Sequence, residues 1–366
     1  MATTLRPTVA EIRLSAVRKN LQKLKRTAAP ARVLFVVKAN AYGHGALPLA
    51  RLAEREALCW GFGVSSVEEG LALRESGVIS PVLVLGSLYP FESFVEAINA
   101  DLMVTIASLD AARQVTAAAK ELGKKAVCHI KLETGMGRIG ARRPSVLKIY
   151  DELEGSGAVA VAGMYTHLSS ADTDPAYTAE QLGFFGETVK ELKERGARGL
   201  TFHAANSCAA VNIPASRFDM VRCGIAAYGL ADGFEPAMTL KTKIVFIKNV
   251  REGAFISYNK SFRADRPMKI ATIPAGYGDG YLRRFSNKAD VLIGGRRCRV
   301  LGNVTMDMTM VDVTAVKDAA VGSEAVLLGR QGTEEITAQE LADIAGTITY
   351  EIVTLVSGRV PRVYAE

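Results

Sequence analysis

The feature that most constrains the fold is a unit that recurs from residue 32 to about residue 230. In each unit, a short apolar run rich in Val, Ile and Phe is followed by a loop and then by an amphipathic stretch of helical period. We count eight runs, at residues 33–37, 60–64, 81–85, 102–106, 126–131, 159–166, 199–202 and 220–223. Strands that alternate with helices form a right-handed parallel sheet, and eight of them without a GxGxxG phosphate loop favour a closed barrel.

The remainder of the chain has a different pattern. After about residue 238, β-branched residues alternate with polar ones between turn signals, as at 243–250, 269–273, 290–293 and 298–300, and one helix is predicted at 338–344. In the first part, helices are predicted at 67–76 and 108–122 from their terminal residues. We therefore predict an α/β fold, with an N-terminal (β/α)8 barrel of the TIM type over residues 1–238 and a mainly β domain over residues 239–366.

Composition and charge exclude several classes of protein. The 45 basic and 38 acidic residues give a net charge of +7, but no basic run is interleaved with aromatics, so we expect no nucleic acid partner. The five cysteines form no CxxC pair, which is typical of reduced core residues, and we expect no metal site. No apolar stretch reaches about 18 residues and the first residues contain no signal-like apolar region, so we expect a cytoplasmic protein without membrane contact.

Polar residues follow several of the predicted strands, and active sites of such barrels gather at that end of the strands. Lys38 follows the first run, and in an apolar mouth its ammonium would lose solvation and become a nucleophile for an aldehyde. Backbone N–H groups beside a hydroxyl, as at Ser207, Gly224 and Ile225, suit a phosphate. Taken singly, these residues also fit a solvent-exposed lysine and ordinary loop positions. His167 and His203 also fit structural histidines, and Tyr42 fits a core aromatic.

Arg222 is the most diagnostic of these residues if the cofactor is pyridoxal phosphate. Most enzymes of that cofactor place a carboxylate at the pyridine nitrogen, which keeps the nitrogen protonated. An arginine keeps its own proton and only donates, so the ring nitrogen opposite it stays neutral. The weaker electron sink suits a reaction that moves a single proton.

These motifs together resemble those of the alanine racemase family over nearly the whole chain. The stretch Val36–Gly45 is similar to the family's cofactor-lysine signature. Further matches follow in sequence order at residues 131–140, 166–167, 203–207, 221–225, 228–230, 257–258, 306–307 and 359–362.

The resemblance implies an enzyme, an isomerase, that interconverts L- and D-alanine by two-base proton transfer on a pyridoxal phosphate aldimine at Lys38. It implies that Tyr42, Ser207, Gly224 and Ile225 hold the phosphate, that Arg222 meets the pyridine nitrogen, and that His167 and Asn206 also belong to the cofactor site. Arg138 would bond the cofactor's phenolic oxygen and the substrate carboxylate, with the backbone of Met306 as the second carboxylate contact.

The resemblance also implies a second base and an assembly. Tyr258 would be the second base, aided by a relay from Arg222 through His167, because a tyrosine hydroxyl is a weak base without nearby positive charge. In the family the β-rich domain closes the partner's barrel, which implies a homodimer with shared active sites. Lys131 matches the position that is carbamylated in many members and fixes Arg138. The expected role is the supply of D-alanine for peptidoglycan.

Three positions depart from the family pattern, and three alternatives stay open. Gly358 stands where some relatives have a tyrosine near the phosphate and substrate entrance, while Glu133 and Thr305 replace frequent Asp and Cys. Gly358 keeps open a racemase for serine or a broader set of amino acids. A decarboxylase of basic amino acids shares the predicted fold, but it normally sets an acid against the ring nitrogen. A cofactor-binding protein without activity is the third alternative, although such relatives lack a second domain.

Overall fold

The structure, a computed structural model, describes residues 5–366 and divides into two compact units. The larger unit contains Arg18–Ala41 and Gly45–Phe234. The other contains the chain up to Val17, Tyr42–His44 and Glu235–Glu366. We refer to them as the barrel unit and the β unit.

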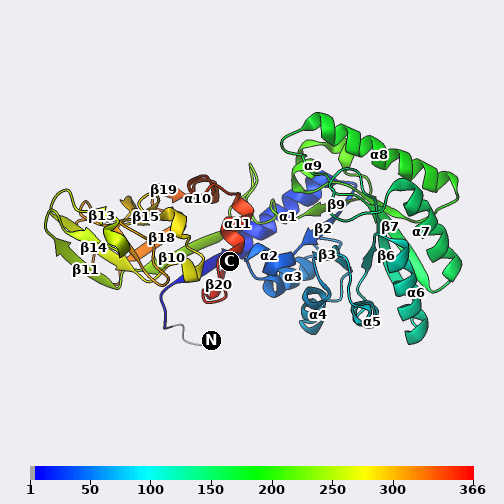
Figure 1. Ribbon diagram of the computed structural model, residues 1–366, viewed down its shortest axis with the longest axis horizontal. Coiled ribbons are helices and arrows are strands. Elements are labelled where there is room, and N and C mark those ends of the chain that lie inside the picture. Colours follow the sequence, from blue (N-terminus) through cyan, green and yellow to red (C-terminus); the bar gives the residue numbers. More distant parts are fainter. Residues whose placement is uncertain (1–4) are drawn as a thin grey trace. The chain divides into compact units, whose positions relative to one another are not determined.

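The barrel unit contains eight parallel strands, and each of the eight predicted runs overlaps one of them (Figure 1). The strands are β2(Arg32–Val36), β3(Gly61–Val64), β4(Val82–Val84), β5(Val104–Ile106), β6(Ala126–Lys131), β7(Val159–Tyr165), β8(Thr201–His203) and β9(Met220–Cys223). Consecutive strands pair in parallel from β2 to β4 and from β5 to β8, and β2 also pairs with β9. The predicted barrel is confirmed.

Two weaker joints close the ring of strands. A single bridge between Leu83 and Met103 joins β4 to β5. Between β8 and β9, Asp219 N–H donates to the Phe202 carbonyl and Arg222 N–H to the Ala205 carbonyl, both at 3.0 Å. Because every strand then has a neighbour on each side, the sheet has no open edge.

Helices connect these strands and lie around their outside (Figure 1). The helices are α1(Leu14–Ala28), which begins in the β unit, α2(Lys38–Tyr42), α3(Ala46–Arg55), α4(Val67–Glu75), α5(Phe91–Asn99), α6(Leu109–Leu122), α7(Arg143–Ser156), α8(Pro175–Glu194) and α9(Ser207–Asn212), with a 3-10 turn η1(Pro214–Ser216). The two helices predicted from terminal residues are present. Helix α6 begins after Ser108, whose hydroxyl accepts the Ala111 N–H at 3.1 Å, and ends at Gly123, where φ is 59°.

The β unit is built on one large and two small sheets. The large sheet has the order β16(Arg296–Arg299), β15(Asp290–Ile293), β18(Glu324–Gln331), β10(Met238–Lys243), β1(Val9–Arg13), β20(Arg362–Ala365), and β19(Glu334–Ile336) pairs with β18. One small sheet contains β11(Phe246–Val250), β14(Met268–Ile273) and β17(Thr309–Asp312), and the other contains β12(Phe255–Ile256) and β13(Phe262–Arg263). The helical elements are α10(Ala338–Ala345), α11(Thr349–Thr354), η2(Tyr258–Lys260), η3(Tyr277–Asp279) and η4(Arg283–Phe285).

The first strand was not predicted, and it belongs to the β unit. Strand β1 lies between β10, to which it is antiparallel, and β20, to which it is parallel. Ala10 and Ile12 are fully buried while Val9 and Glu11 are partly exposed, so the strand has a period of two over only five residues. The predicted domain boundary after residue 238 falls at the first residue of β10.

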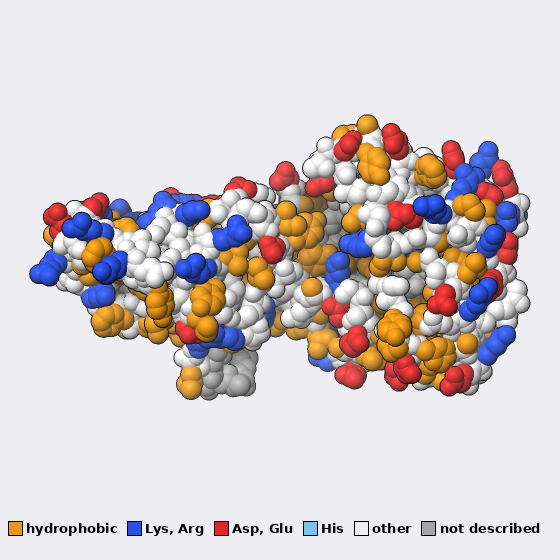
Figure 2. All heavy atoms as spheres, viewed as in Figure 1, with side chains coloured by type: hydrophobic (Ala, Val, Ile, Leu, Met, Phe, Trp, Pro, Cys, Tyr) orange, Lys and Arg blue, Asp and Glu red, His pale blue; other side chains and the backbone are white. Residues whose placement is uncertain are grey.

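Two further observations concern the surface and the cysteines. On the face shown in Figure 2, acidic and basic side chains are interspersed. All five cysteines are free, but Cys59 and Cys208 are partly exposed, so only Cys128, Cys223 and Cys298 are the expected core residues. Within residues 5–366, no helix is both long and apolar enough to cross a membrane.

Candidate active site

Lys38 stands at the carboxyl end of β2, at the start of a left-handed turn. Residues 39–42 have φ between 50° and 54°, a conformation that costs roughly 1–2 kcal/mol for each residue with a side chain. The turn is held by Ala41 N–H, which donates to the Val37 carbonyl at 2.8 Å, and by Ala39 N–H, which donates to Glu69 Oε1 at 2.7 Å. Strain of this kind is typical of functional sites, where the surrounding structure imposes it.

The electrostatic surroundings of Lys38 favour the neutral amine. Burial, and then the positive charge of Arg138, hold its pKa below the usual value, while the charge of Glu69 acts in the opposite direction. Glu69 is engaged elsewhere, because its second oxygen accepts the Ser65 N–H at 2.7 Å. The amine of Lys38 is therefore a better nucleophile than that of an exposed lysine.

Arg222, on β9, is buried among the ends of two neighbouring strands. Its two terminal nitrogens donate to the carbonyls of Thr166 at 2.7 Å, Ala204 at 3.0 Å and His203 at 3.1 Å. They also lie 3.4 Å from Nδ1 of His167 and 3.1 Å from Nδ1 of His203. Burial lowers the arginine's pKa to about 10, which still leaves it charged at neutral pH.

The hydrogen bonds of Arg222 define the tautomers of a histidine chain behind it. Because a guanidinium only donates, His203 accepts at Nδ1 and carries its proton on Nε2. That N–H then donates to Nδ1 of His129 at 2.9 Å, so His129 also carries its proton on Nε2. Burial comes first among the causes that lower the pKa of His203 well below 6.5 and that of His129 to about 3, so both rings stay neutral.

Lys131, the last residue of β6, is a buried lysine without a carboxylate partner in the described part of the chain. Burial, and then the charges of Arg138 and Arg222, lower its pKa to about 8. The nearest acid in sequence, Glu133, is occupied by the N–H groups of Gly135 at 2.6 Å and Gly137 at 3.0 Å. Glu133 thus forms no ion pair with Lys131, and the nearby cations outweigh its charge.

One aromatic ring lies beside both of these buried cations. The Tyr165 ring centre is 5.5 Å from Nζ of Lys131 and 5.1 Å from the guanidinium carbon of Arg222. The ring stacks on His203 at 4.8 Å, and its hydroxyl is 2.8 Å from that of Thr105. Tyr165 thus fixes the spacing between the lysine and the arginine.

The segment predicted to hold a phosphate contains backbone donors. Asn206 caps α9, because its Oδ1 accepts the Ala209 N–H at 3.0 Å. The Ser207 hydroxyl accepts N–H groups from Gly224 at 3.0 Å and Ala226 at 3.4 Å. Ile225 is a buried residue with an exposed fraction of 6%, and its N–H has no acceptor among residues 5–366.

The other predicted residues belong to the β unit, where Tyr42 contacts a residue that the sequence did not single out. The rings of Tyr42 and Tyr350 are 5.9 Å apart, and burial is the main cause that raises the pKa of Tyr42. Tyr350 follows a stretch with no polar motif, so nothing in its sequence surroundings marked it. A side chain at Gly358 would meet no atom within 4 Å.

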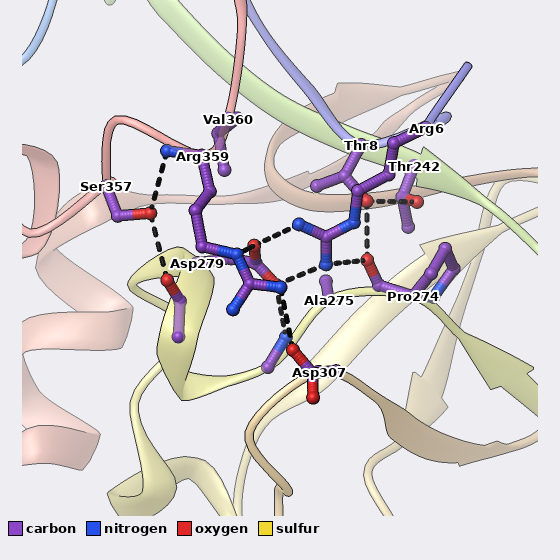
Figure 3. A network of polar contacts seen from close by, with 12 residues as sticks. Arg6, Thr8, Thr242, Pro274, Ala275, Asp279, Asp307, Ser357, Arg359 and Val360 are labelled. Atoms are coloured by element: carbon purple, nitrogen blue, oxygen red, sulfur yellow. Dashed lines mark hydrogen bonds and ion pairs between the residues drawn. The ribbon is translucent and has the colours of Figure 1, made fainter.

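Tyr258 and Met306 lie on exposed segments of the β unit. Tyr258 begins η2 and is 71% exposed, while the side chain of Met306 is 52% exposed. Ion pairs between Arg359 and both Asp279 and Asp307 anchor the segment beside Met306 (Figure 3). The exposed Met306 thus lies on an anchored segment.

The structure brings one subset of the predicted residues together within the barrel unit. The charge of Arg138 lowers the pKa values of Lys38, Lys131 and His167, and the charge of Arg222 lowers those of Lys131 and His167. Burial and these cations lower the pKa of His167 to about 3. Sequence analysis missed His129 and Tyr165, which lie inside strands rather than after them. Alternating strand positions with polar side chains could have revealed both.

Fold and strand-end residues define the class of protein: a barrel enzyme with a second, mainly β unit and an amine of lowered pKa suited to an aldehyde cofactor. Comparisons with known proteins agree. A family model for "Alanine racemase, N-terminal domain" matches residues 12–232, and one for "Alanine racemase, C-terminal domain" matches residues 237–364. The chain belongs to the alanine racemase family.

Individual relatives match over their full length. An alanine racemase from Symbiobacterium thermophilum is 45% identical over 371 residues, covering 98% of this chain and 97% of the relative. Among solved structures, the alanine racemase of Bacillus anthracis with bound L-Ala-P has a TM-score of 0.93 and 36% identity, covering 100% of this chain and 96% of that chain. The alanine racemase of Streptomyces coelicolor A3(2) has a TM-score of 0.94 and 35% identity, covering 99% of each chain.

The histidine tautomers give a first prediction, which is tractable because the chain has only four histidines. In ¹⁵N-histidine-labelled holoenzyme, His129, His167 and His203 should show the Nε2–H tautomer and remain neutral from pH 8 to pH 5, since burial lowers their pKa values. His44 is an internal control with the opposite tautomer, Nδ1–H, because its Nδ1 lies 2.9 Å from the Tyr42 carbonyl oxygen and must donate. Signals are assigned with single His→Gln variants. An imidazolium signal from His203 near pH 6.5 would contradict the assignment.

Proposed function

We propose that this protein interconverts L- and D-alanine with pyridoxal phosphate bound through Lys38. Pyridoxal phosphate dependence and alanine racemase activity are the properties of its family. The observation that carries the residue-level proposal is a pair of groups at the ends of two paired strands, β2 and β9. These are an amine of lowered pKa, that of Lys38, and a buried arginine, Arg222, that donates to three backbone carbonyls.

The donors around the barrel's strand ends fit this cofactor. The hydrogen bonds of Arg222 use its terminal nitrogens, and none of the described residues accepts from its Nε–H, which suits the unprotonated pyridine nitrogen. The unbonded N–H of Ile225 and the Ser207 hydroxyl suit a phosphate. We assign the phosphate to Tyr42, Ser207, Gly224 and Ile225, the phenolic oxygen to Arg138, and supporting contacts to His167 and Asn206.

The chain's own residues would supply the two proton transfers. When bound, pyridoxal phosphate makes the α-proton of an amino acid acidic by withdrawing electrons into its ring. Racemisation then requires a proton to leave one face of the α-carbon and return on the other, so it needs a base on each side. We assign the Lys38 amine to the D-alanine side and the Tyr258 hydroxyl to the L-alanine side. His167 accepts from Arg222 at Nδ1 and therefore has its Nε2–H left to support the tyrosine oxygen.

Tyr258 and Met306 would act in the partner subunit's active site, in a homodimer. Two observations support this: both residues are exposed in the chain, and both lie in the β unit while Lys38 lies in the barrel unit. Arg138 and the Met306 N–H would bind the substrate carboxylate. The cellular role would be the supply of D-alanine for peptidoglycan in the cytoplasm.

The alternatives are not favoured by the family match. The relatives described above are alanine racemases, and both domain models match, which fits neither a one-domain cofactor-binding protein nor a decarboxylase. Arg222 also fills the position where a decarboxylase needs an acid.

The activity is tested by incubating the purified holoenzyme with a panel of L-amino acids and measuring the enantiomers formed. We expect D-alanine as the main product, and Lys38→Ala should reduce the rate by at least about a thousandfold. Borohydride reduction followed by peptide mapping should place the pyridoxyl mass on Lys38. Label on another lysine would overturn the site, and serine as the preferred substrate would overturn the specificity.

We also propose that Lys131 carries a carbamate. The ammonium of Lys131 would first lose one proton, and its neutral amine would then attack CO2, forming a C–N bond and releasing a second proton. The side chain would thus change from a cation to an anion among Arg138, Arg222 and Lys38. Only the neutral amine reacts. Because the pKa is about 8 instead of 10.5, that form is abundant at pH 8.

This proposal predicts one slowly exchanging ¹³C carbamate signal when the holoenzyme is placed in ¹³C-bicarbonate at pH 8. Lys131→Ala should remove the signal. Lys241→Gln is the matched control, because the hydrogen bond that Lys241 donates to Glu11 raises the pKa of Lys241 and keeps its amine protonated. A signal that survives Lys131→Ala would exclude the carbamate at this residue.

The shared-site proposal predicts that two inactive variants restore each other. In a mixed dimer of Lys38→Ala and Tyr258→Phe, one site receives both defects and the other receives both intact bases. Random exchange makes half of the dimers mixed, so about one quarter of wild-type activity should return. In Tyr258→Phe alone, α-proton exchange of L-alanine should fall far more than that of D-alanine.

Subunit exchange must be followed independently, by mass spectrometry of dimers with differently labelled subunits. Mixing wild type with Lys38→Ala is the control for dilution. Confirmed exchange with no returned activity would place both bases on one chain.

A further inference from the structure

The segment around Met306 has two backbone donors that its own surroundings leave unbonded. From Leu301 to Met308, each N–H has an acceptor within the described chain except those of Met306 and Asp307. The two N–H groups are adjacent, which suits an anion such as a carboxylate. The position of this dipeptide is set by contacts of its carbonyl groups and side chains.

The backbone of residues 276–278 holds the carbonyl side. Gly278 N–H donates to the Met306 carbonyl at 2.9 Å, and Tyr277 N–H donates to the Thr305 carbonyl at 3.0 Å. The approach is so close that a side chain at Gly276 would overlap the Thr305 carbonyl. Any shift of η3 would therefore shift Met306.

Asp279, at the end of η3, is a buried charge that fixes this backbone (Figure 3). Its carboxylate is 1% exposed and accepts from both terminal nitrogens of Arg6, with NH2 to Oδ2 at 2.6 Å, and from Gly276 N–H at 3.0 Å. Arg6 also donates to the Pro274 carbonyl at 2.8 Å. A buried carboxylate with so many donors imposes one geometry on the loop, because any alternative leaves it unpaired.

Arg359 connects the buried carboxylate to the exposed dipeptide. Its Nε lies 3.6 Å from Asp279 Oδ1, and its NH2 donates to Asp307 Oδ1 at 2.7 Å (Figure 3). Two arginines face two aspartates, so the four charges cancel and an approaching carboxylate meets no net negative charge. The dipeptide is thus held at its carbonyl and at the Asp307 side chain, and its N–H groups are left for a ligand.

We propose that Asp279 is a positioning residue for the substrate carboxylate, and that Arg359 and Arg6 are its partners. We call Asp279, Arg6 and Arg359 the clamp. Arg6 belongs to the amino-terminal segment and Arg359 to the carboxyl-terminal segment. The inference rests on the proposed function of the Met306 N–H. Hydrogen bonds to a charged ligand lose strength steeply when distance and angle change, so a loosened dipeptide would weaken ground-state binding of alanine.

The test compares Arg359→Gln, Arg359→Lys and Asp279→Asn holoenzymes with a control, Arg330→Gln. Arg330 is 75% exposed and pairs with Glu335 elsewhere in the β unit. We measure KM and kcat for alanine, the inhibition constant of propionate, and hydrogen–deuterium exchange of residues 302–309 without substrate. Propionate has the carboxylate of alanine but no amino group, so it reports the carboxylate contact alone.

For Arg359→Gln, we expect KM and the inhibition constant of propionate to rise together by about tenfold, with kcat within about twofold. Exchange at residues 302–309 should accelerate, while the cofactor's absorbance stays unchanged. Asp279→Asn should act in the same direction and more strongly, and Arg359→Lys should recover only part of the loss because a lysine cannot reach both carboxylates.

Three outcomes would overturn the inference: Arg359→Gln equal to the control, kcat falling with KM unchanged, or full recovery in Arg359→Lys, which would make charge alone responsible. If Asp279→Asn fails to fold, the Arg359 variants still decide. A wild-type protein that neither racemises alanine nor binds propionate would refute the proposed function itself, whereas a normal wild type with unaffected variants would refute only the clamp.

Discussion

A single buried guanidinium, that of Arg222, ties together the ends of three neighbouring barrel strands. It lies on β9 and donates to carbonyls that follow β7 and β8, close to one of the joints that close the barrel. Carbonyl groups and neutral rings surround this buried cation, and no carboxylate among residues 5–366 pairs with it. The positions of His167, His203 and Tyr165 are therefore set by its hydrogen bonds and by its charge.

The same interaction explains the direction of the surrounding pKa shifts. Burial and the charge of Arg222 keep the adjacent histidines neutral, and burial with the charges of Arg138 and Arg222 keeps the amine of Lys131 easily deprotonated. The histidine chain ends at His129 Nε2, a buried atom without a partner in the described chain. A proton entering this chain from Arg222 would have no acceptor at the far end, so the arginine retains its charge.

The sequence predicts those features of the structure that residues close together in the chain determine. It does not predict features that depend on residues far apart in the chain. The eight barrel strands were predicted because each is a local apolar run bounded by polar residues. Lys38 and Arg222 were predicted as site residues because the end of a strand is visible in the sequence. Strand β1 was missed because its five residues are recognisable as a strand only from their pairing with β10 and β20. Tyr350 was missed because only packing brings it to Tyr42. The left-handed turn at residues 39–42 was equally invisible, since Ala and Tyr there do not favour positive φ.

The place of β1 in the large sheet has a consequence for synthesis. This strand is translated before the rest of its sheet, yet the strands on either side of it, β10 and β20, lie at residues 238–243 and 362–365. The barrel residues therefore emerge from the ribosome while the sequence Val9–Arg13 still lacks both neighbours. The β unit cannot be completed as a contiguous C-terminal fragment, because β20 joins the large sheet only through β1. Anyone who divides this gene between its two family domains will separate a central strand from its sheet.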